Sequence, residues 1–361
     1  MRTELANRQP LYWADRLRNL ATLLVIMIHA SGTVAQEHHE CDSLFWWSGN
    51  LWASLARPSV PLFVMLSGFL LLGKDYPLGD FLKKRFGRVV VPALFWMVIY
   101  SYYNYRARGI PATIAEGIQG IVERPVHYHL WFIYLIVGLY MVYPVLRPWV
   151  RSAKEQDYRY FFACVVLGTW VYKVLSVFFG IHIGIYFELF TNNCGYFVLG
   201  YYLGNKEVGG GRSEIEDGGP MPWRLSERRV RVLAIGLIVL GTAITAVGTW
   251  WASKAQGGAF HPFFYDYLSP NVGMAAIGWF LLARWSWHKL PLLDVEKQLA
   301  AASFGIYFVH VLAMDWWSVS GHWQTKTHPA AGIPIVVGLT ALMSFAAILL
   351  IRAFPGGQRI T

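Results

Sequence analysis

Long apolar segments alternate with short polar ones along almost the whole chain. A helix needs about 17 to 25 such residues to cross roughly 30 Å of hydrocarbon. Ten segments fit this length approximately: 17–35, 48–72, 89–105, 128–146, 159–179, 183–204, 230–252, 268–284, 299–319 and 330–352. The pattern predicts an all-α fold, a polytopic integral membrane protein with about ten transmembrane helices.

Composition agrees with a membrane protein. Of the 361 residues, 55% are hydrophobic and only 14% are charged, about half the charge of an ordinary soluble domain. The one long polar insertion, at about 205–231, is rich in glycine and mixed charges, as expected for a cytoplasmic linker between two spans. We therefore expect a single transmembrane domain over 1–361.

The basic residues give an orientation, because loops retained in the cytoplasm are enriched in lysine and arginine. With the N-terminus inside, the inner segments hold 24 of these residues and the outer segments five, while Arg57 and Lys173 fall within spans. Both termini are therefore expected to be cytoplasmic. The net charge of +10 is explained by anionic membrane lipid at the inner surface, so we expect no nucleic acid partner. The first span is long and has no clean cleavage site, which favours a retained helix over a signal peptide.

The cysteines and outer histidines do not suggest metal or disulfide chemistry. Cys41, Cys164 and Cys194 are too few and too scattered for a disulfide framework or a thiolate site. The acidic stretch QEHHECD at 36–42 is better explained as a solvated loop than as a metal site. No metal is expected.

The first span contains an isolated histidine, in the sequence RLRNLATLLVIMIH. Arg18 and His29 are eleven residues apart, which on a helix is three turns plus about 20° and a rise of roughly 16 Å. Both side chains therefore project from one face, with the arginine near the cytoplasmic edge. An ionisable group at such depth is a functional candidate, although a neutral histidine bonded between helices is the alternative.

The second span carries a charge within the membrane. Arg57 is followed by Pro58 and Pro61, which lack two backbone N–H groups and leave carbonyls free. A broken, charged helix of this kind is typical of a cavity wall, so Arg57 is a candidate cavity residue. The alternative is a simple proline kink with the arginine extending outward to the interface.

Two more arginines stand at the cytoplasmic entry to the third span, in FLKKRFGRVVVP. Arg85 and Arg88 are three residues apart, which makes them neighbours on one face of a regular helix. Together with Arg18 they can form a guanidinium cluster that grips phosphate through paired hydrogen bonds. The alternative is that they only anchor the topology.

Further polar residues within the later spans are candidates for the same cavity. Glu188 and Asn192 share a helical face in the sixth span, and a carboxylate there can orient the His29 ring. His310 and Asp315 lie in the ninth span. Each of the four is explained equally well by a hydrogen bond between helices.

Several motifs, taken together and in order, resemble acyltransferase family 3, a family of membrane-bound O-acyltransferases. They are RLRNLATLLVIMIH, RPSVPLFVMLSGFLL, KRFGRVVVP, HYHLWFIYLIVGLYMVYPVL and SFGIYFVH. The resemblance implies transfer of an acetyl group from cytoplasmic acetyl-CoA, as co-substrate, to a sugar hydroxyl. The acceptor implied is a lipid-linked or exported glycan of the cell envelope, and the location is the bacterial cytoplasmic (inner) membrane.

The resemblance also assigns roles to particular residues. The essential arginine and histidine of the family fall on Arg18 and His29, and its arginine pair falls on Arg85 and Arg88. Its Ser-Gly-aromatic motif corresponds to the segment that begins at Ser67. His29 would act as a general base or as a nucleophile that forms a transient acetyl-imidazole, two mechanisms that stay open.

A transporter or flippase of acyl groups or lipid-linked sugars is the alternative function. The sequence has no paired helix interruptions in corresponding halves, which such inverted-repeat proteins often show. Enzymatic acyl transfer is therefore the favoured prediction.

Overall fold

The computed structural model describes residues 11–37, 40–108, 123–183, 192–205, 226–287, 291–319 and 327–361, and these contain helices but no β-strand. Eight helical segments are long and apolar enough to cross a membrane: Tyr12–Glu37, Leu44–Leu72, Leu78–Arg106, Tyr128–Ser152, Glu155–Phe179, Glu227–Ala255, Asp294–Trp317 and Pro329–Ala353. The prediction of an all-α, polytopic membrane protein is thereby confirmed.

The two other predicted spans correspond to shorter helices. They are α10 (Asn193–Asn205), with 13 residues, and α12 (Pro270–Ser286), with 17 residues. Residues 184–191, which precede α10 in the predicted sixth span, lie outside the described part of the chain. The count of ten spans and the cytoplasmic position of both termini stay predictions.

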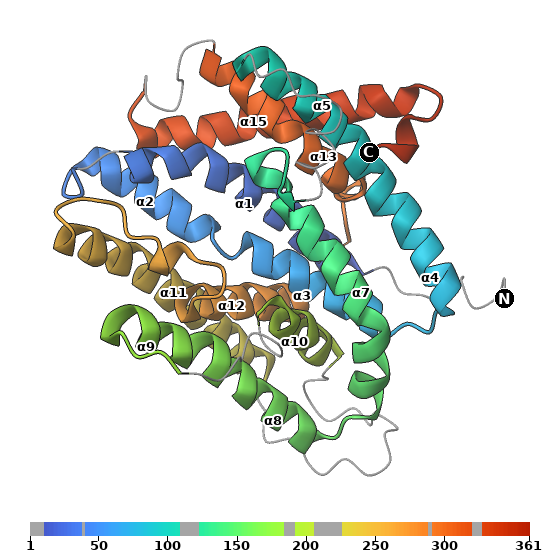
Figure 1. Ribbon diagram of the computed structural model, residues 1–361, viewed down its shortest axis with the longest axis horizontal. Helices are drawn as coiled ribbons and strands as arrows, with labels where there is room; N and C mark the ends of the chain where they lie inside the picture. The colour runs from blue at the N-terminus through green and yellow to red at the C-terminus, as the bar shows by residue number, and fades with distance from the viewer. Residues whose placement is uncertain are drawn as a thin grey trace.

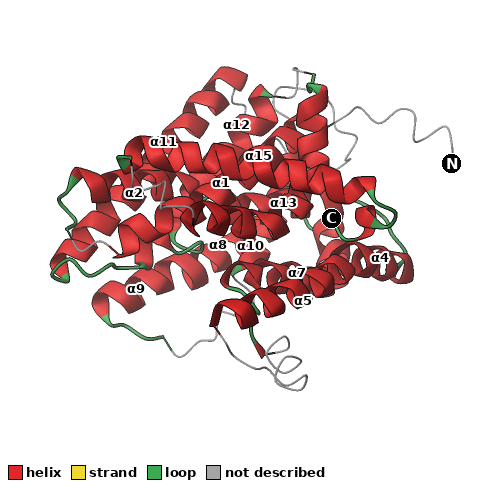
Figure 2. Cartoon of the chain, turned by 90° about the horizontal axis from the view of Figure 1, so that it is seen from above, coloured by secondary structure: helices red, strands yellow, loops and turns green. Residues whose placement is uncertain are grey.

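The first helix lies at the centre of the bundle. Helix α1 (Tyr12–Glu37) packs against α12 and against four further helices: α2 (Leu44–Ala56), α3 (Ser59–Leu72), α13 (Asp294–Val319) and α15 (Pro329–Ala353). Figure 1 shows α1 between α15 on one side and α2 and α3 on the other, and Figure 2 shows the same bundle from above. Side chains on α1 are therefore enclosed by residues from distant parts of the sequence.

The second span is broken in its middle. Helix α2 ends at Ala56, α3 begins at Ser59, and Arg57 and Pro58 join them. Proline supplies no N–H, so Pro58 and Pro61 cannot bond the carbonyls one turn before them. The regular pattern resumes when the Leu62 N–H donates to the carbonyl of Pro58, at 2.9 Å. The predicted interruption of this span is therefore present.

A close helix crossing follows the break. A Cβ atom at Gly68 of α3 would lie 1.8 Å from the carbonyl oxygen of Phe197, and one at Gly200 of α10 would lie 1.9 Å from that of Met65. No side chain fits at those distances, so glycine at both positions lets the two backbones touch. Helix α10 is thereby held firmly against α3.

The third and fifth spans each contain a π-helical segment. The third consists of α4 (Leu78–Arg85), η1 (Phe86–Val90) and α5 (Val91–Arg108). The fifth consists of α8 (Glu155–Val165), η3 (Val166–Val171) and α9 (Tyr172–Phe179). Wider π turns change which side chains share a face. The fourth span begins with the short η2 (Tyr128–Leu130) and continues as α7 (Trp131–Ser152).

The predicted cytoplasmic linker is shorter than expected at its C-terminal end. Of the range 205–231, residues 206–225 lie outside the described part of the chain. Helix α11 (Glu227–Ala255) already begins at Glu227, because the Ser226 hydroxyl accepts a hydrogen bond from the Arg229 N–H at 3.4 Å and caps it. The loop after α11 holds η5 (Phe263–Tyr265), and η6 (Gly357–Arg359) follows α15.

Candidate active site

Three aromatic or imidazole rings surround His29 of α1. Its ring centroid lies 5.1 Å from that of Tyr128, 5.3 Å from that of His310 and 6.5 Å from that of His129. Two of these residues come from η2 and one from α13, so three segments distant in sequence meet here. The His29 side chain keeps partial solvent exposure. It is therefore enclosed by the bundle without being fully buried.

Helix α1 continues without a break from Tyr12 to Glu37. Eleven residues of regular helix separate Arg18 from His29, so the two side chains project from the same face, roughly 16 Å apart along the axis. His29 lies about 26 Å from the Tyr12 end of the helix and about 12 Å from the Glu37 end. A ligand held at Arg18 that reaches His29 must be long and extended.

His310 presents a free nitrogen close to His29. Its Nδ1 lies 2.6 Å from the carbonyl oxygen of Tyr307, so Nδ1 carries the hydrogen and donates it. Nε2 is then a hydrogen-bond acceptor, and it is buried without a partner among the described residues. A buried acceptor without a donor is costly, and a bound hydroxyl or water would satisfy it.

A layer of residues that the sequence analysis did not single out supports these rings. Nδ1 of His127 lies 3.1 Å from Nδ1 of His129, and the Tyr307 hydroxyl donates to the His129 carbonyl at 2.6 Å. The Tyr100 hydroxyl donates to the Phe308 carbonyl at 2.6 Å. The sequence contains His127 and His129 one residue apart, directly before Leu-Trp-Phe, and this pattern could have marked them as candidates. Nothing in the sequence, however, indicates that they lie beside α1 and α13.

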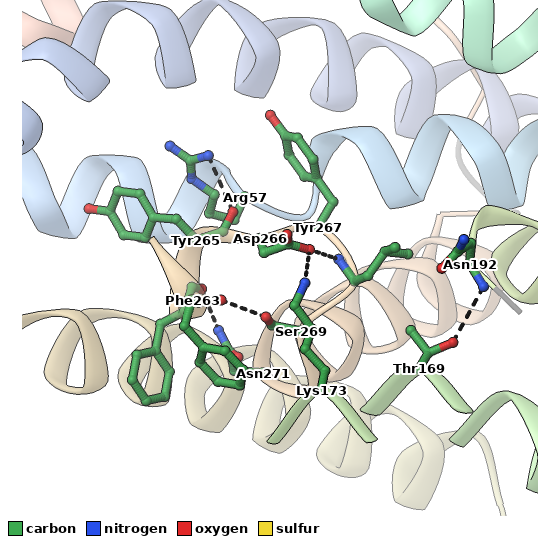
Figure 3. A network of polar contacts seen from close by, with 12 residues as sticks. Arg57, Thr169, Lys173, Asn192, Phe263, Tyr265, Asp266, Tyr267, Ser269 and Asn271 are labelled. Carbon is green, nitrogen blue, oxygen red and sulfur yellow. Dashed lines mark hydrogen bonds and ion pairs between the residues drawn. The ribbon is translucent and has the colours of Figure 1, made fainter. Parts of the chain in front are cut away.

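Arg57, at the break of the second span, is buried with 7% of its surface exposed. Its guanidinium carbon lies 4.2 Å from the centroid of the Tyr265 ring, and Nη1 donates to the Tyr265 carbonyl at 3.3 Å. Figure 3 shows this contact with the loop between α11 and α12. Arg57 is therefore enclosed by the bundle, which favours the interpretation as an interior residue over an arginine that extends outward.

The arginines at the Tyr12 end of α1 differ in their partners. Arg16 forms a two-point ion pair with Glu296 of α13, at 2.9 and 3.0 Å, and so ties α1 to α13. Within the part of the chain that the structure describes, Arg18 pairs with Asp15 alone, at 2.8 Å, and both side chains are partly exposed. An exposed pair of this kind contributes little, so Arg18 can exchange Asp15 for another anion.

The arginine pair of the third span does not share one environment. Arg85 is partly buried, with its guanidinium carbon 5.6 Å from the Tyr140 ring centroid, while Arg88 is exposed. The reason is the π-helical segment Phe86–Val90, which begins directly after Arg85 and changes the angular spacing expected of a regular helix. The interpretation of both as neighbours on one regular face is corrected accordingly.

The three residues of the Ser-Gly-aromatic motif have different environments. Gly68 makes the close crossing with α10, and the Phe69 ring packs at 4.8 Å on that of Trp13 in α1. Ser67 is partly exposed. Two of the three motif residues therefore have a structural role.

The remaining candidates, Asp315, Asn192 and Glu188, are not among the rings described around His29. Asp315 accepts a hydrogen bond from the Tyr103 hydroxyl at 2.8 Å. Asn192 precedes α10 in a left-handed conformation (φ 62°), and its N–H donates to the Thr169 hydroxyl. It is therefore not on a helical face, contrary to expectation. Glu188 lies outside the described residues.

Asn192 borders a largely apolar cavity of about 280 Å³ between the fifth span, α10 and α12. Its walls include Phe162, Val166, Trp170 and Leu199, and none of its lining residues belongs to the group around His29.

Among the described residues, no cluster of histidine, cysteine, aspartate or glutamate has the geometry to hold a metal ion.

These features define a multi-pass membrane protein with a partly accessible histidine inside its helical bundle. The family model of the acyltransferase domain, Acyl_transf_3, matches residues 11–352. The chain therefore belongs to acyltransferase family 3 and is a membrane acyltransferase. No curated protein and no solved structure matches it.

Proposed function

We propose that this protein is an O-acetyltransferase of the bacterial inner membrane. It takes the acetyl group from cytoplasmic acetyl-CoA and transfers it to a sugar hydroxyl of a lipid-linked or exported envelope polysaccharide. The observation that carries the proposal is the partly exposed His29, which shares a helix face with Arg18 and lies with its ring 5.3 Å from that of His310, measured between centroids.

The donor is proposed to enter at the Arg18 end of α1. Arg18, Arg85 and Arg88 supply guanidinium groups for the phosphates of the coenzyme. The pantetheine arm then extends along α1, over the roughly 16 Å that separate Arg18 from His29. Since Arg18 has only a partly exposed carboxylate partner, it is available to bind phosphate.

The transfer step uses His29 as a general base in the simplest version. The imidazole takes the proton from the sugar hydroxyl as its oxygen attacks the thioester carbonyl. Attack by His29 itself, with a transient acetyl-imidazole, is the competing version. In both versions the unpartnered Nε2 of His310 is proposed to accept a hydrogen bond from a second hydroxyl of the bound sugar or from a water molecule.

The acceptor is proposed to approach from the face opposite to the donor. His29 lies nearer the Glu37 end of α1, and the break at Arg57–Pro58 interrupts the neighbouring span. The two substrates then meet inside the bundle, and the coenzyme does not cross the membrane. Asp315, Ser67 and Asn192 are proposed as more distant residues of the acceptor route.

Within the family, the segments YWADRLRNLATLLVIMIH, RPSVPLF and HYHLWF look most like the enterobacterial common antigen O-acetyltransferase. A glycan of the bacterial envelope is therefore the first acceptor to test. This choice of acceptor is independent of the proposed donor site.

The test is acetyl transfer by purified protein in lipid nanodiscs, with labelled acetyl-CoA and envelope glycan fractions. The wild-type protein is expected to label the glycan, and His29→Ala is expected to abolish labelling while binding acetyl-CoA and unfolding at the wild-type temperature. Full activity of a well-folded His29→Ala protein would remove His29 from the mechanism. Transport of acetyl-CoA or lipid-linked sugar without any acetylated product would favour a transporter or flippase.

Sidedness is tested separately, in sealed vesicles of known orientation. Labelled acetyl-CoA supplied on the cytoplasmic side is expected to label glycan exposed on the other side. Label confined to acceptor on the cytoplasmic side would contradict the through-membrane geometry and leave the acetyltransferase assignment standing.

A further inference from the structure

Arg57 is a buried cation without an anionic partner in the described part of the chain. It is 7% exposed, and its Nε is buried with no hydrogen-bond partner. Lys173, a cation in the same polar network, is neutralised by Asp266 at 2.5 Å. Burying an unneutralised charge is costly, so this arrangement favours binding of an anion.

The groups that hold Arg57 position its charge without cancelling it. The Tyr265 ring lies 4.2 Å and the Tyr267 ring 5.8 Å from its guanidinium carbon. Tyr265 is itself fixed, because its hydroxyl donates to Oδ1 of Asn50 on α2 at 2.7 Å. Cation–π contacts attract the guanidinium but leave its full positive charge.

This charge lies on the span that packs against the helix of His29. Arg57 joins α2 to α3, and α1, which carries His29, packs against both of these helices. In Figure 3 the guanidinium and the Tyr267 hydroxyl point the same way, away from the pair formed by Lys173 and Asp266. An unpartnered N–H donor therefore lies at the break of a span that packs against the helix of His29.

We infer that the Arg57 guanidinium binds the oxyanion that forms on the thioester carbonyl during acetyl transfer. This inference rests on the proposed function. The acceptor oxygen bonds to the carbonyl carbon, its proton passes to His29, and the carbonyl π electrons move onto the oxygen beside Arg57. On collapse the carbonyl reforms, the C–S bond breaks, and the departing thiolate of coenzyme A takes the proton from His29.

The role of Arg57 is the same in both versions of the mechanism. If His29 attacks first, the formation and the breakdown of the acetyl-imidazole each pass through a tetrahedral oxyanion. Because this charge is present only near the transition state, Arg57 accelerates the chemical step more than it strengthens donor binding.

The experiment compares Arg57→Met and Arg57→Lys with the wild-type protein in nanodiscs, measuring kcat, KM for acetyl-CoA and equilibrium binding of acetyl-CoA. Loss of one oxyanion donor lowers kcat by about 100- to 1000-fold in hydrolases that use such donors. We expect that loss for Arg57→Met, an intermediate loss for Arg57→Lys, and acetyl-CoA affinity within about threefold of wild type for both.

Lys173→Met is the matched control, because it removes a cation from the same network that already has its own carboxylate partner. It is expected to keep kcat within a few-fold of wild type. If Arg57→Met does not fold, the test rests on Arg57→Lys, which keeps the charge. For that variant a lowered kcat with nearly unchanged acetyl-CoA affinity is again the expected result.

Two results would overturn the inference. One is wild-type kcat in Arg57→Lys and Arg57→Met, and the other is loss of acetyl-CoA affinity with kcat unchanged, which would make Arg57 a donor-binding residue. Failure of the proposed function is distinguishable, because then the wild-type protein itself transfers no acetyl group from acetyl-CoA.

Discussion

The imidazole ring of His310 on α13 lies 5.3 Å from that of His29 on α1, measured between centroids. The two helices are in direct contact, and the ion pair between Arg16 and Glu296 joins them near their other ends. The distance between the rings is therefore set by the packing of two full-length helices rather than by a loop. His310 is therefore held in a fixed position beside the proposed catalytic residue.

His310→Ala is expected to lower kcat by about ten- to a hundredfold, because the acceptor Nε2 that orients a hydroxyl near His29 is lost. Acetyl-CoA affinity is expected to stay within a few-fold of wild type. Steady-state kinetics and equilibrium binding separate the two effects. His328→Ala serves as control, since that histidine is exposed and caps α15. Equal activity of both variants would show that His310 is a packing residue.

Replacing Arg85 or Arg88 with glutamine is expected to weaken acetyl-CoA binding by about 1.5–3 kcal/mol, the usual contribution of a hydrogen bond to a charged group. The measurement is calorimetry in nanodiscs. Lys83→Gln, which removes an exposed cation from the same helix, is expected to change the affinity little. Unchanged affinity in both variants would show that Arg85 and Arg88 do not bind the donor and only anchor the membrane topology.

Gly68→Ala is expected to lower the thermal stability clearly, because its Cβ would lie 1.8 Å from the carbonyl oxygen of Phe197. Overpacking of this kind costs about 1–3 kcal/mol or more. At Gly236 of α11, the Cβ that alanine adds would meet no atom within 4 Å, so Gly236→Ala is expected to be neutral or slightly stabilising. Unfolding temperatures in detergent that rank the two variants the other way would contradict the close crossing.

Asp75 gives a pH-dependent contribution to stability. Hydrogen bonds from Arg151 and Arg147 lower the pKa of this exposed carboxyl below its ordinary value of 3.8. A lowered pKa means that the ion pairs stabilise the fold above pH 3.8 and lose this effect as the pH falls through the lower folded-state value. The Asp75→Asn variant is expected to have a slightly lower unfolding temperature than wild type at neutral pH. This difference in unfolding temperature should vanish in strong acid. A difference independent of pH would exclude this origin.

The sequence predicted the fold class well because membrane helices leave a direct signal in apolar length. The break in the second span was also predictable, since Pro58 and Pro61 cannot complete the hydrogen-bond pattern. The π-helical segments were not predictable, and Phe86–Val90 altered the expected relation between Arg85 and Arg88. No simple periodicity indicates a π turn.

The candidate site was predicted only in part. The helical spacing of Arg18 and His29 gave their common face, because it depends on one helix alone. The rings of His129 and His310 were placed beside His29 by packing between distant helices, which a single sequence does not encode in any local pattern. The same holds for Arg57, whose contact with Tyr265 spans 208 positions.

That separation has a consequence for biosynthesis. Arg57 enters the membrane with an early hairpin, but Tyr265 is synthesised 208 residues later, which takes about 10 to 40 s at 5–20 residues per second. Without its aromatic partners, an arginine at mid-span costs about 2.5–3.5 kcal/mol on insertion scales. The nascent second span must therefore rely on α1 and on water until the loop after α11 arrives. A late loop thus completes the environment of an early helix, and the reactive centre is complete only after His310, of the 361 residues, has also been synthesised.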